Sequence, residues 1–529
     1  MNIFKRLSNY KKILKYIKFN KLLFKKKSNH ESSDIILVEV NDIYPSIISY
    51  SMLSNYLAKK YKSKIIGYKI YDNNLFVKIL NYFSPISLSN IYKSFGVSEI
   101  FTPVKKKEKI IRYKFSSKKD LLEFKKDNIK IGDLIYDSYL RKNYEATVDL
   151  ESENFAIFFN NSLELFNFWN HYFKNNKVKA IIASHSVYNL GIPIRIAIHY
   201  EVDAFLTGIS FLNYFNKNRV CEVNSMAYNE YFNGLSSEQK ASSMKIAKNE
   251  LKKKFSKQGG YANSTEVFQS TTPFVIEDNK YQTFGEIKKK NVFKKNGKPN
   301  ILVTAHCFYD SPHAIEDLLF NDFYDWIDHL GKLSNETDYN WYLKKHPHTA
   351  NKGLNDKTLN KFIKRYPKLQ ILDETINNSE LMNEQVDLTL TVYGSVGYEF
   401  PYFGIPVLLA SPKTSYENYN FCIQPSSIEE YDSYIKDLKK TKYKIDKNEI
   451  YKFYFNRYLA SWSLLDNYIN HKINLKNDFF GPMILEIWIK QFDDMKLSKI
   501  NTEISQFINN KKYRLISDDA HKVINFSRI

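Results

Sequence analysis

Short continuous apolar runs alternate along this chain with longer helical patterns, and this alternation predicts an α/β fold. The continuous runs are rich in β-branched residues and lie at residues 35–40, 178–184, 301–305 and 386–392. Such runs are typical of strands that are buried on both faces of a parallel sheet. Patterns that predict helices separate them, among others at residues 46–60, 155–175, 236–254 and 320–333. Together with a further strand at 64–68, the first run and the first helix form a βαβ unit, which favours a Rossmann-like domain.

The same pattern divides the chain into two parts that each contain a sheet. A short strand at 204–208 is expected to end the first sheet, and a loop-rich stretch then leads to a junction near 291–298. The predicted parts are a first Rossmann-like domain at residues 31–295, a second at 296–450, and C-terminal helices with a loosely held polar tail at 451–529.

Residues 1–27 predict a basic amphipathic helix. They contain ten Lys or Arg residues and no acid, and apolar residues recur between Ile3 and Phe24 at nearly helical spacing. Lysines interrupt every apolar stretch, so the segment is not a signal peptide. One interpretation is that residues 1–30 contact an anionic membrane surface, which attracts each basic residue by about 1 kcal/mol. The other is a solvated helix that packs on its own protein.

Composition adds few restrictions to this picture. The chain has 529 residues, a formal net charge of +21 and an ordinary hydrophobic fraction of 43%, and its length suits two or three domains. Its three cysteines have neither metal-site nor disulfide spacing, which indicates a reducing cytoplasm. No apolar run reaches the ~18 residues of a transmembrane helix. No nucleic-acid-binding module is recognisable, so the basic charge does not predict a nucleic-acid partner.

The stretch Val386–Ser411 carries the clearest chemical signal. A buried strand leads into the small-residue turn Gly394-Ser395-Val396, a helix follows, and Val407 begins a second strand. A loop at the carboxyl end of a strand is where open α/β sheets bind ligands, and small residues let backbone N–H groups approach an anion. Glu399, one turn into the helix, is placed to accept hydrogen bonds from a sugar's hydroxyl pair. The alternative is a plain connection whose glycines serve packing.

A second signal lies about 40 residues earlier. The strand that begins at Trp341 ends in Lys345-His346-Pro347, because Pro347 cannot donate to a sheet ladder. Lys345 and His346 are therefore expected at the same sheet edge as Gly394, where a cation-capable pair suits a diphosphate or a nucleoside monophosphate.

With these residues in place, the sequence resembles the GT-B-type glycosyltransferases of bacterial surface polysaccharide synthesis, in particular the capsule polysaccharide biosynthesis group, which includes Kdo transferases. The resemblance rests on the motifs Lys344–Pro347, Thr391–Glu399 and Gly404–Val407, and on Ala305–His313. It covers residues 300–435 well and the first half of the chain in outline.

The resemblance implies two Rossmann-like domains that face a cleft, with a nucleotide-sugar donor held mainly by the second domain. It implies that the loop bearing His306, Asp310 and His313 lines the donor site. His346, Lys345 and the turn at Gly394 would stabilise the leaving phosphate, and Glu399 would bind the donor ribose. The group usually works without a catalytic metal, so no metal or other cofactor is expected. A cytoplasmic enzyme on the inner face of the bacterial plasma membrane, acting on a glycan or lipid-linked glycan, follows from the same resemblance.

Candidates for the acceptor side lie in the first domain. Asp42 follows the first strand and is a candidate general base, with Glu39 second; the alternative is that Asp42 caps a helix or turn. His185 follows the strand at 178–184, and histidine is the side chain that most often serves as a general base. Arg195, in the next helix, is a candidate for holding an anionic acceptor group, or else forms an ordinary ion pair.

Two rival functions remain from the sequence. One is a polyol-phosphate transferase that consumes a CDP-alcohol, and the other is a non-catalytic polysaccharide-assembly protein with the same fold. The chain lacks the paired-acid-plus-glycine motif of HP-motif sialyltransferases, so the general base and the donor nucleotide stay open.

Overall fold

A computed structural model describes most of the chain. The described residues are 3–24, 33–69, 84–103, 111–221, 226–255, 292–346, 352–373, 376, 378–382, 384–466, 480–517 and 520. Pro347, the last residue of the motif Lys344–Pro347, lies outside them.

The first domain is built on a six-stranded sheet in the order β3-β2-β1-β6-β7-β8. Five strands run parallel and β8 is an antiparallel edge. The strands are β1 (Ile35–Glu39), β2 (Lys64–Tyr68), β3 (Val97–Phe101), β6 (Val178–Ala183), β7 (Asp203–Gly208) and β8 (Phe211–Phe215). A two-stranded ribbon of β4 (Lys125–Lys126) and β5 (Ile129–Lys130) accompanies the sheet.

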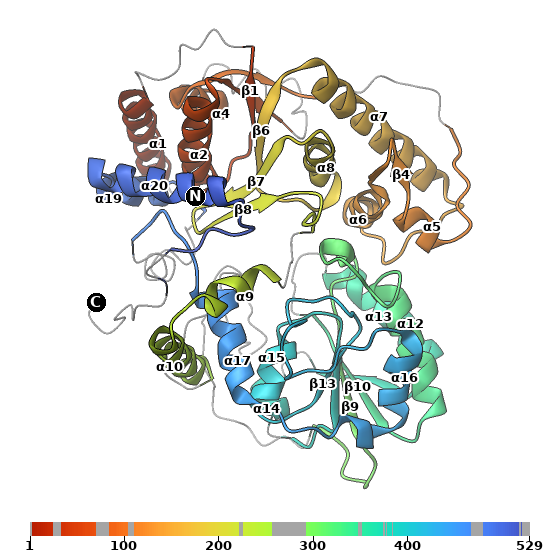
Figure 1. The fold of residues 1–529 in the computed structure, drawn as a ribbon. Helices are drawn as coiled ribbons and strands as arrows, with labels where there is room; N and C mark the ends of the chain where they lie inside the picture. The colour runs from red at the N-terminus through yellow and green to blue at the C-terminus, as the bar shows by residue number, and fades with distance from the viewer. Residues whose placement is uncertain are drawn as a thin grey trace.

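Helices cover both faces of this sheet (Figure 1). The helices around the first sheet are α1 (Ile3–Phe24), α2 (Tyr44–Tyr61), α4 (Leu88–Ser94), α5 (Lys118–Leu122), α6 (Gly132–Asn143), α7 (Glu153–Asn175) and α8 (Gly191–His199). Successive β1 residues alternate between two cores: Leu37 packs on the side of α6 to α8, and Ile36 and Val38 pack on the side of α1 and α2. Burial on both faces explains the uninterrupted apolar sequence of the strand.

The second domain has a five-stranded, all-parallel sheet in the order β11-β10-β9-β12-β13. Its strands are β9 (Asn300–Thr304), β10 (Asn340–Lys344), β11 (Leu369–Ile371), β12 (Leu388–Thr391) and β13 (Val407–Leu409). Its helices are α9 (Met226–Asn233), α10 (Ser237–Lys254), α12 (Phe323–Glu336), α13 (Lys352–Arg365), α14 (Asn378–Met382), α15 (Val396–Tyr402), α16 (Ile428–Lys436) and α17 (Lys447–Tyr454). The structure thus confirms the predicted fold class, a mixed α/β chain with two parallel-sheet domains.

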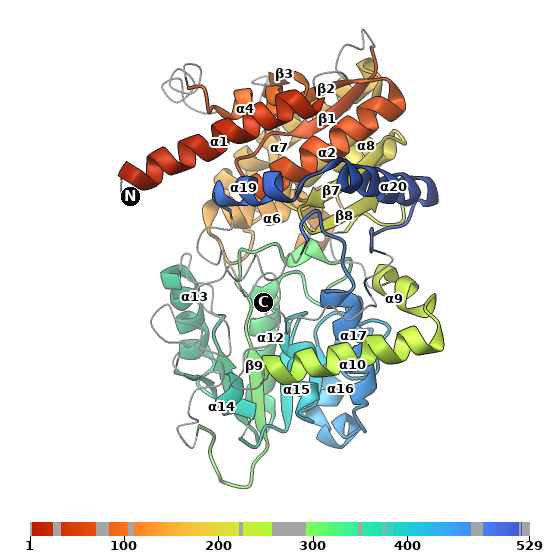
Figure 2. The ribbon, with the colours of Figure 1, turned by 90° about the vertical axis from the view of Figure 1, so that its left-hand side faces the viewer.

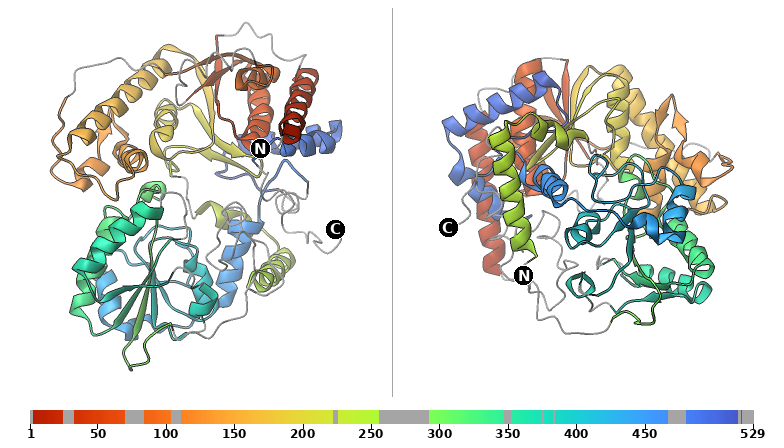
Figure 3. Two further views of the ribbon diagram at one scale, coloured as in Figure 1. Left: turned by 180° about the vertical axis from the view of Figure 1, so that it is seen from behind. Right: turned by 60° about the horizontal axis from the view of Figure 1, so that its bottom comes forward.

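The chain crosses between the domains at different places from the predicted junction near 291–298. Helices α9 and α10 already pack against the second domain, beside α15 and α17 (Figure 3). After a π-helical turn at Phe455–Leu459, the chain returns to the first domain, where the backbone N–H of Leu464 donates to the Ile209 carbonyl at 2.9 Å.

The last described segments belong to the first domain, and two predictions fail there. Helix α19 (Met483–Gln491) is one of the predicted C-terminal helices, whereas α20 (Asp494–Asn510) forms where a loosely held tail was predicted. Both helices bury apolar residues in the same core as α1 and α2. Residues Tyr513 and Leu515 then pair with β8 through backbone hydrogen bonds of 2.8 and 2.9 Å. The strand at 204–208 therefore does not end the first sheet, because β8 and this segment continue it.

Helix α1 lies along the outside of the first domain, and its N-terminal end extends past the other elements (Figure 2). Its inner face is buried against α19 and α4, and Tyr16 on this face is fully buried. The ring of Phe19 meets the ring of Phe492 edge to face, with 5.1 Å between the ring centres. No helix in the described ranges is long and apolar enough to cross a bilayer.

Candidate functional site

The order of strands in the second sheet reverses between β9 and β12, and such a switch point is where open α/β sheets bind ligands. The carboxyl ends of β9, β10 and β12 lead directly to His306, His346 and Gly394. The structure therefore brings these three predicted residues to one edge of the sheet.

His306 is held firmly at this switch point. Its Nε2 lies 3.1 Å from the Thr391 hydroxyl and accepts the Val392 backbone N–H at 3.3 Å, while the ring stacks on Phe323 with 4.6 Å between ring centres. Burial, with a smaller contribution from nearby His346, lowers the pKa of His306 to about 3. The ring is thus neutral at pH 7, and since Nε2 accepts, Nδ1 carries the proton.

Gly394 lies beside this histidine because it has no side chain. A Cβ atom at this position would lie 2.9 Å from the Thr391 hydroxyl and 3.6 Å from His306 Cε1. Gly394 and Ser395 are half-buried, whereas Val396 is buried. The helix that follows has only seven residues, so its dipole adds little. Lys345 forms an ion pair with Asp356 at 2.9 Å, which turns the side chain toward α13.

Glu399 does not lie in an open site. Its side chain is fully buried, and Oε1 lies 3.2 Å from the ammonium of Lys254, which also donates to the Tyr398 hydroxyl at 2.8 Å. A carboxylate enclosed in this way is not available to a ribose, so the predicted role of Glu399 in binding donor is not retained.

The first sheet has its own switch point, between β1 and β6, and Glu39 and Ser184 meet there. The Glu39 carboxylate accepts the Ser184 backbone N–H at 2.5 Å and the Ser184 hydroxyl at 3.1 Å. The next residue, His185, has an exposed side chain whose Nδ1 lies 2.8 Å from the Ser184 oxygen. His185 therefore sits at the predicted carboxyl edge.

The other two first-domain candidates differ in their surroundings. Asp42 is exposed after β1 and does not cap α2, since no side chain caps that helix. Arg195 is buried and forms a bidentate ion pair with Asp133, in which each guanidinium nitrogen donates to a carboxylate oxygen at 2.5 Å. It also donates to the Lys130 carbonyl. Arg195 is therefore a structural ion pair rather than a group open to an acceptor.

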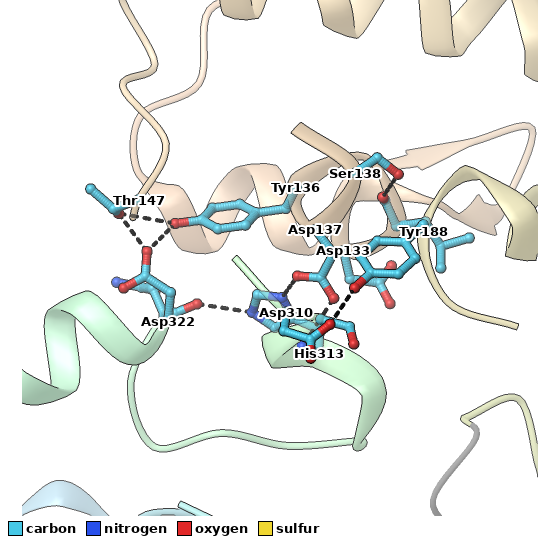
Figure 4. A network of polar contacts seen from close by, with 12 residues as sticks. Asp133, Tyr136, Asp137, Ser138, Thr147, Tyr188, Asp310, His313 and Asp322 are labelled. Carbon is cyan, nitrogen blue, oxygen red and sulfur yellow. Dashed lines mark hydrogen bonds and ion pairs between the residues drawn. The ribbon is translucent and has the colours of Figure 1, made fainter. Parts of the chain in front are cut away.

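Asp310 and His313 of the predicted donor-site loop contact the first domain (Figure 4). The Tyr188 hydroxyl, in the loop after β6, donates to Asp310 at 2.9 Å. His313 Nδ1 lies 2.6 Å from Asp137 of α6, and its Nε2 donates to the Asn321 carbonyl at 2.9 Å. Nearby, the Tyr136 hydroxyl donates to Asp322 at 2.5 Å.

These contacts also place the two switch points relative to each other. The loop after β6, which carries His185, touches the loop after β9, which carries His306. The carboxyl edges of the two sheets therefore face each other, with one exposed histidine on the first-domain side and two histidines on the second-domain side. Such a pairing can hold an anionic leaving group on one side and a proton acceptor on the other.

Sequence reasoning missed the residues that support these histidines. Ser184 directly precedes His185 at the end of β6, and Thr391 ends β12 at the start of the motif Thr391–Glu399, so these positions were the available signal. Within the described residues, no three side chains that commonly ligate metals lie close enough together to hold an ion.

Comparison with known protein families and with curated protein sequences finds no match for this chain. Several solved structures are similar in outline. A UDP-GlcNAc 2-epimerase from Neisseria meningitidis is 10% identical, with coverage of 87% of this chain and 100% of the epimerase and a TM-score of 0.21. A glycosyltransferase from Rickettsia africae is 12% identical, with coverage of 90% and 99% and a TM-score of 0.24.

The N-terminal domain of a Candida albicans trehalose-6-phosphate phosphatase is 9% identical, with coverage of 88% and 98% and a TM-score of 0.25. Superpositions this weak carry no conclusion about the activity of the present chain.

Proposed function

We propose that the protein is a glycosyltransferase that moves a sugar from a nucleotide-activated donor to a hydroxyl of a growing surface glycan of the capsule or lipopolysaccharide type. The observation that carries this proposal is the contact between the loop after β6 and the loop after β9, which begin at the switch points of the two sheets. His306, His346 and Gly394 supply a polar edge in the second domain that would face the donor's phosphates, and His185 lies on the facing loop.

The chain's own groups account for the charge changes of such a transfer. Negative charge grows on the leaving phosphate, where His346 and the neutral N–H donor of His306 would stabilise it. The proton of the attacking hydroxyl would go to a base on the first-domain side. In this scheme Glu399 and Lys254 serve the architecture and not the donor.

A thermal-shift series tests the donor site, with CMP, CDP, UDP, GDP and their common sugar conjugates as ligands. At about 100 times its dissociation constant, a bound nucleotide stabilises the protein by about 2.7 kcal/mol. We expect one nucleotide to do so and His346→Ala to weaken its binding by about 1.5–3 kcal/mol, the usual effect of losing a charged hydrogen bond.

The control variant is His171→Ala, which removes an exposed histidine from α7 in the first domain. CMP would indicate a Kdo- or sialic-acid-like donor, and UDP or GDP a hexose. Stabilisation by CDP and CDP-alcohols alone would favour the polyol-phosphate transferase. No shift with any nucleotide would contradict the proposal and favour the non-catalytic assembly protein.

We also propose that the outer face of α1 contacts an anionic membrane surface. Leu7, Lys11, Lys15, Lys18 and Leu22 are exposed, and their spacing places them on one side of the helix, opposite the buried face. Lysines between exposed leucines suit the boundary between lipid headgroups and acyl chains.

A further inference from the structure

Among the described residues, the polar contacts of Glu39 at the β1/β6 switch point are all with hydrogen-bond donors. Besides the two groups of Ser184, it accepts the Tyr50 hydroxyl at 3.0 Å and the Asn41 amide at 3.3 Å. The side chain is almost fully buried, with 3% exposed. A carboxylate surrounded only by donors is satisfied as an acceptor, that is, in its ionised form.

The protons of this arrangement fix the role of each atom. Ser184 has one hydroxyl proton, and that proton is directed to Glu39 Oε1. The Ser184 oxygen, 2.8 Å from His185 Nδ1, must then accept in that contact. Nδ1 therefore carries the proton. In a neutral imidazole only one nitrogen is protonated, so Nε2 of His185 keeps its lone pair.

We propose that Glu39 and Ser184 are positioning residues that hold His185 in its Nδ1–H tautomer, so that Nε2 acts as the general base for the acceptor. The part of this proposal that concerns the acceptor rests on the proposed function. The acceptor oxygen forms a bond to the anomeric carbon while the bond from that carbon to the nucleotide phosphate breaks. The phosphate leaves with the electron pair, and the acceptor's proton moves to Nε2.

The environment of the histidine agrees with this role. Its side chain is exposed, whereas Ser184 and Glu39 are buried beneath it. The same loop contacts the second domain through Tyr188 and Asp310. The imidazolium formed by proton transfer would be stabilised by the Glu39 charge through the Ser184 hydroxyl. Asp42, the first candidate from the sequence, has no comparable chain of supporting contacts among the described residues.

The tautomer can be measured without any substrate. In protein labelled with 15N-histidine, the His185 signals are assigned by their loss in His185→Ala, and the shifts of the two ring nitrogens identify the protonated one. We expect Nδ1 to be protonated in the wild type and in Ser184→Thr, which keeps the hydroxyl. Ser184→Ala is expected to lose this preference. Protonation at Nε2 in the wild type, or an unchanged tautomer in Ser184→Ala, would overturn the positioning role.

Transfer assays test the second half of the proposal, with thermal unfolding used to verify that each variant is folded. General-base catalysis contributes about 10²–10⁴-fold, so His185→Ala should lower kcat by that factor and leave donor binding unchanged. Ser184→Ala and Glu39→Gln should lower kcat by about 10–100-fold, the usual cost of losing a group that orients a histidine.

Ser184→Thr should restore the rate, and His171→Ala should have no effect. A full rate in His185→Ala would overturn the assignment of His185 as base, and a full rate in Ser184→Ala would overturn the positioning role of Ser184. If no transfer occurs with any donor that binds, the proposed function fails, and the NMR result still decides whether Glu39 and Ser184 set the tautomer.

Discussion

At the scale of single residues, the buried pair of Lys254 and Glu399 shows how a motif residue can serve the fold. Lys254 ends α10 and Glu399 lies in α15, and their charged atoms are 3.2 Å apart with side chains 6% and 0% exposed. The pair joins a helix that precedes the second sheet to the helix that follows β12. Removing this ion pair should therefore lower the free energy of unfolding more than it changes ligand binding.

Lys254→Met is expected to destabilise the protein by about 3–5 kcal/mol, because it leaves the Glu399 carboxylate buried without its cation. Urea unfolding followed by tryptophan fluorescence measures the change. The double variant Lys254→Met/Glu399→Leu should recover most of the loss, since an apolar pair of similar volume replaces a buried ion pair at little cost. A single variant that unfolds like the wild type would show that Glu399 is hydrated in solution and would restore it as a ribose-binding candidate.

From the sequence, the location of the site residues in the fold could be predicted, but not the groups that they contact. A histidine or glycine directly after an apolar run lies at the carboxyl edge of a parallel sheet, and His185, His306, His346 and Gly394 all lie there. The partners of each group were not predictable. Glu39 and Ser184 are 145 residues apart in sequence, and Arg195 and Asp133 are 62 residues apart, so only the packed fold brings them together.

At the scale of elements, the two interpretations of the basic N-terminal segment apply to different faces of α1. The inner face packs on the first domain through residues such as Tyr16 and Phe24, so deletion of the helix would also expose the core. The outer face, which carries the exposed lysines, takes no part in this packing and is free to contact a membrane. A test of membrane contact therefore has to change the outer face alone.

Lys11→Glu/Lys15→Glu/Lys18→Glu is expected to release the protein from vesicles that contain an anionic phospholipid. Each lysine contributes about 1 kcal/mol near such a surface, so losing three weakens binding by at least about 3 kcal/mol. Vesicle sedimentation measures the bound fraction. The matched control, Lys439→Glu/Lys440→Glu/Lys442→Glu, changes three exposed lysines of the second domain. Equal binding of the wild type and both variants would make α1 an ordinary surface helix.

Elements buried on both faces were the ones that the sequence pattern predicted well. Strands β1, β6, β9 and β12 match their apolar runs closely. Helix α20 was missed because lysines and polar residues surround its short apolar stripe of Ile500, Ile504 and Phe507, which faces the core only once α2 and α19 are in place. Strand β8 was missed because its sequence, FLNYF, has polar residues beside it in the chain and pairs antiparallel with β7.

At the scale of the whole molecule, the contact between α6 and the loop after β9 contains a buried charge pair. Burial alone would lower the pKa of His313, but Asp137 and the Asn321 carbonyl outweigh burial and raise the pKa above its ordinary value. The His313 backbone N–H also donates to Asp137 at 3.1 Å. We therefore assign the pair as imidazolium and carboxylate.

This assignment predicts a pH dependence. A histidine whose folded-state pKa is raised stabilises the protein fully below its unfolded pKa of about 6.5, and this contribution is lost as pH rises through the folded-state value. The melting temperature of the wild type should thus exceed that of His313→Gln most at pH 5 to 6, and the difference should shrink toward higher pH. A difference that is the same from pH 5 to 9 would show that the proton on His313 does not contribute, and His171→Gln controls for general effects of removing a histidine.

The return of the chain to the first domain after Leu459 has a consequence for synthesis. Protein chains emerge from the ribosome N-terminus first, so the second sheet, complete at Leu409, is made before α19, α20 and the residues that pair with β8. The part of the first sheet's core that contains Trp488 and Ile504 cannot close until those segments have emerged. The first domain, although most of it precedes the second domain in the chain, thus completes its core after the second sheet has been made, and in the interval that part of its core stays uncovered.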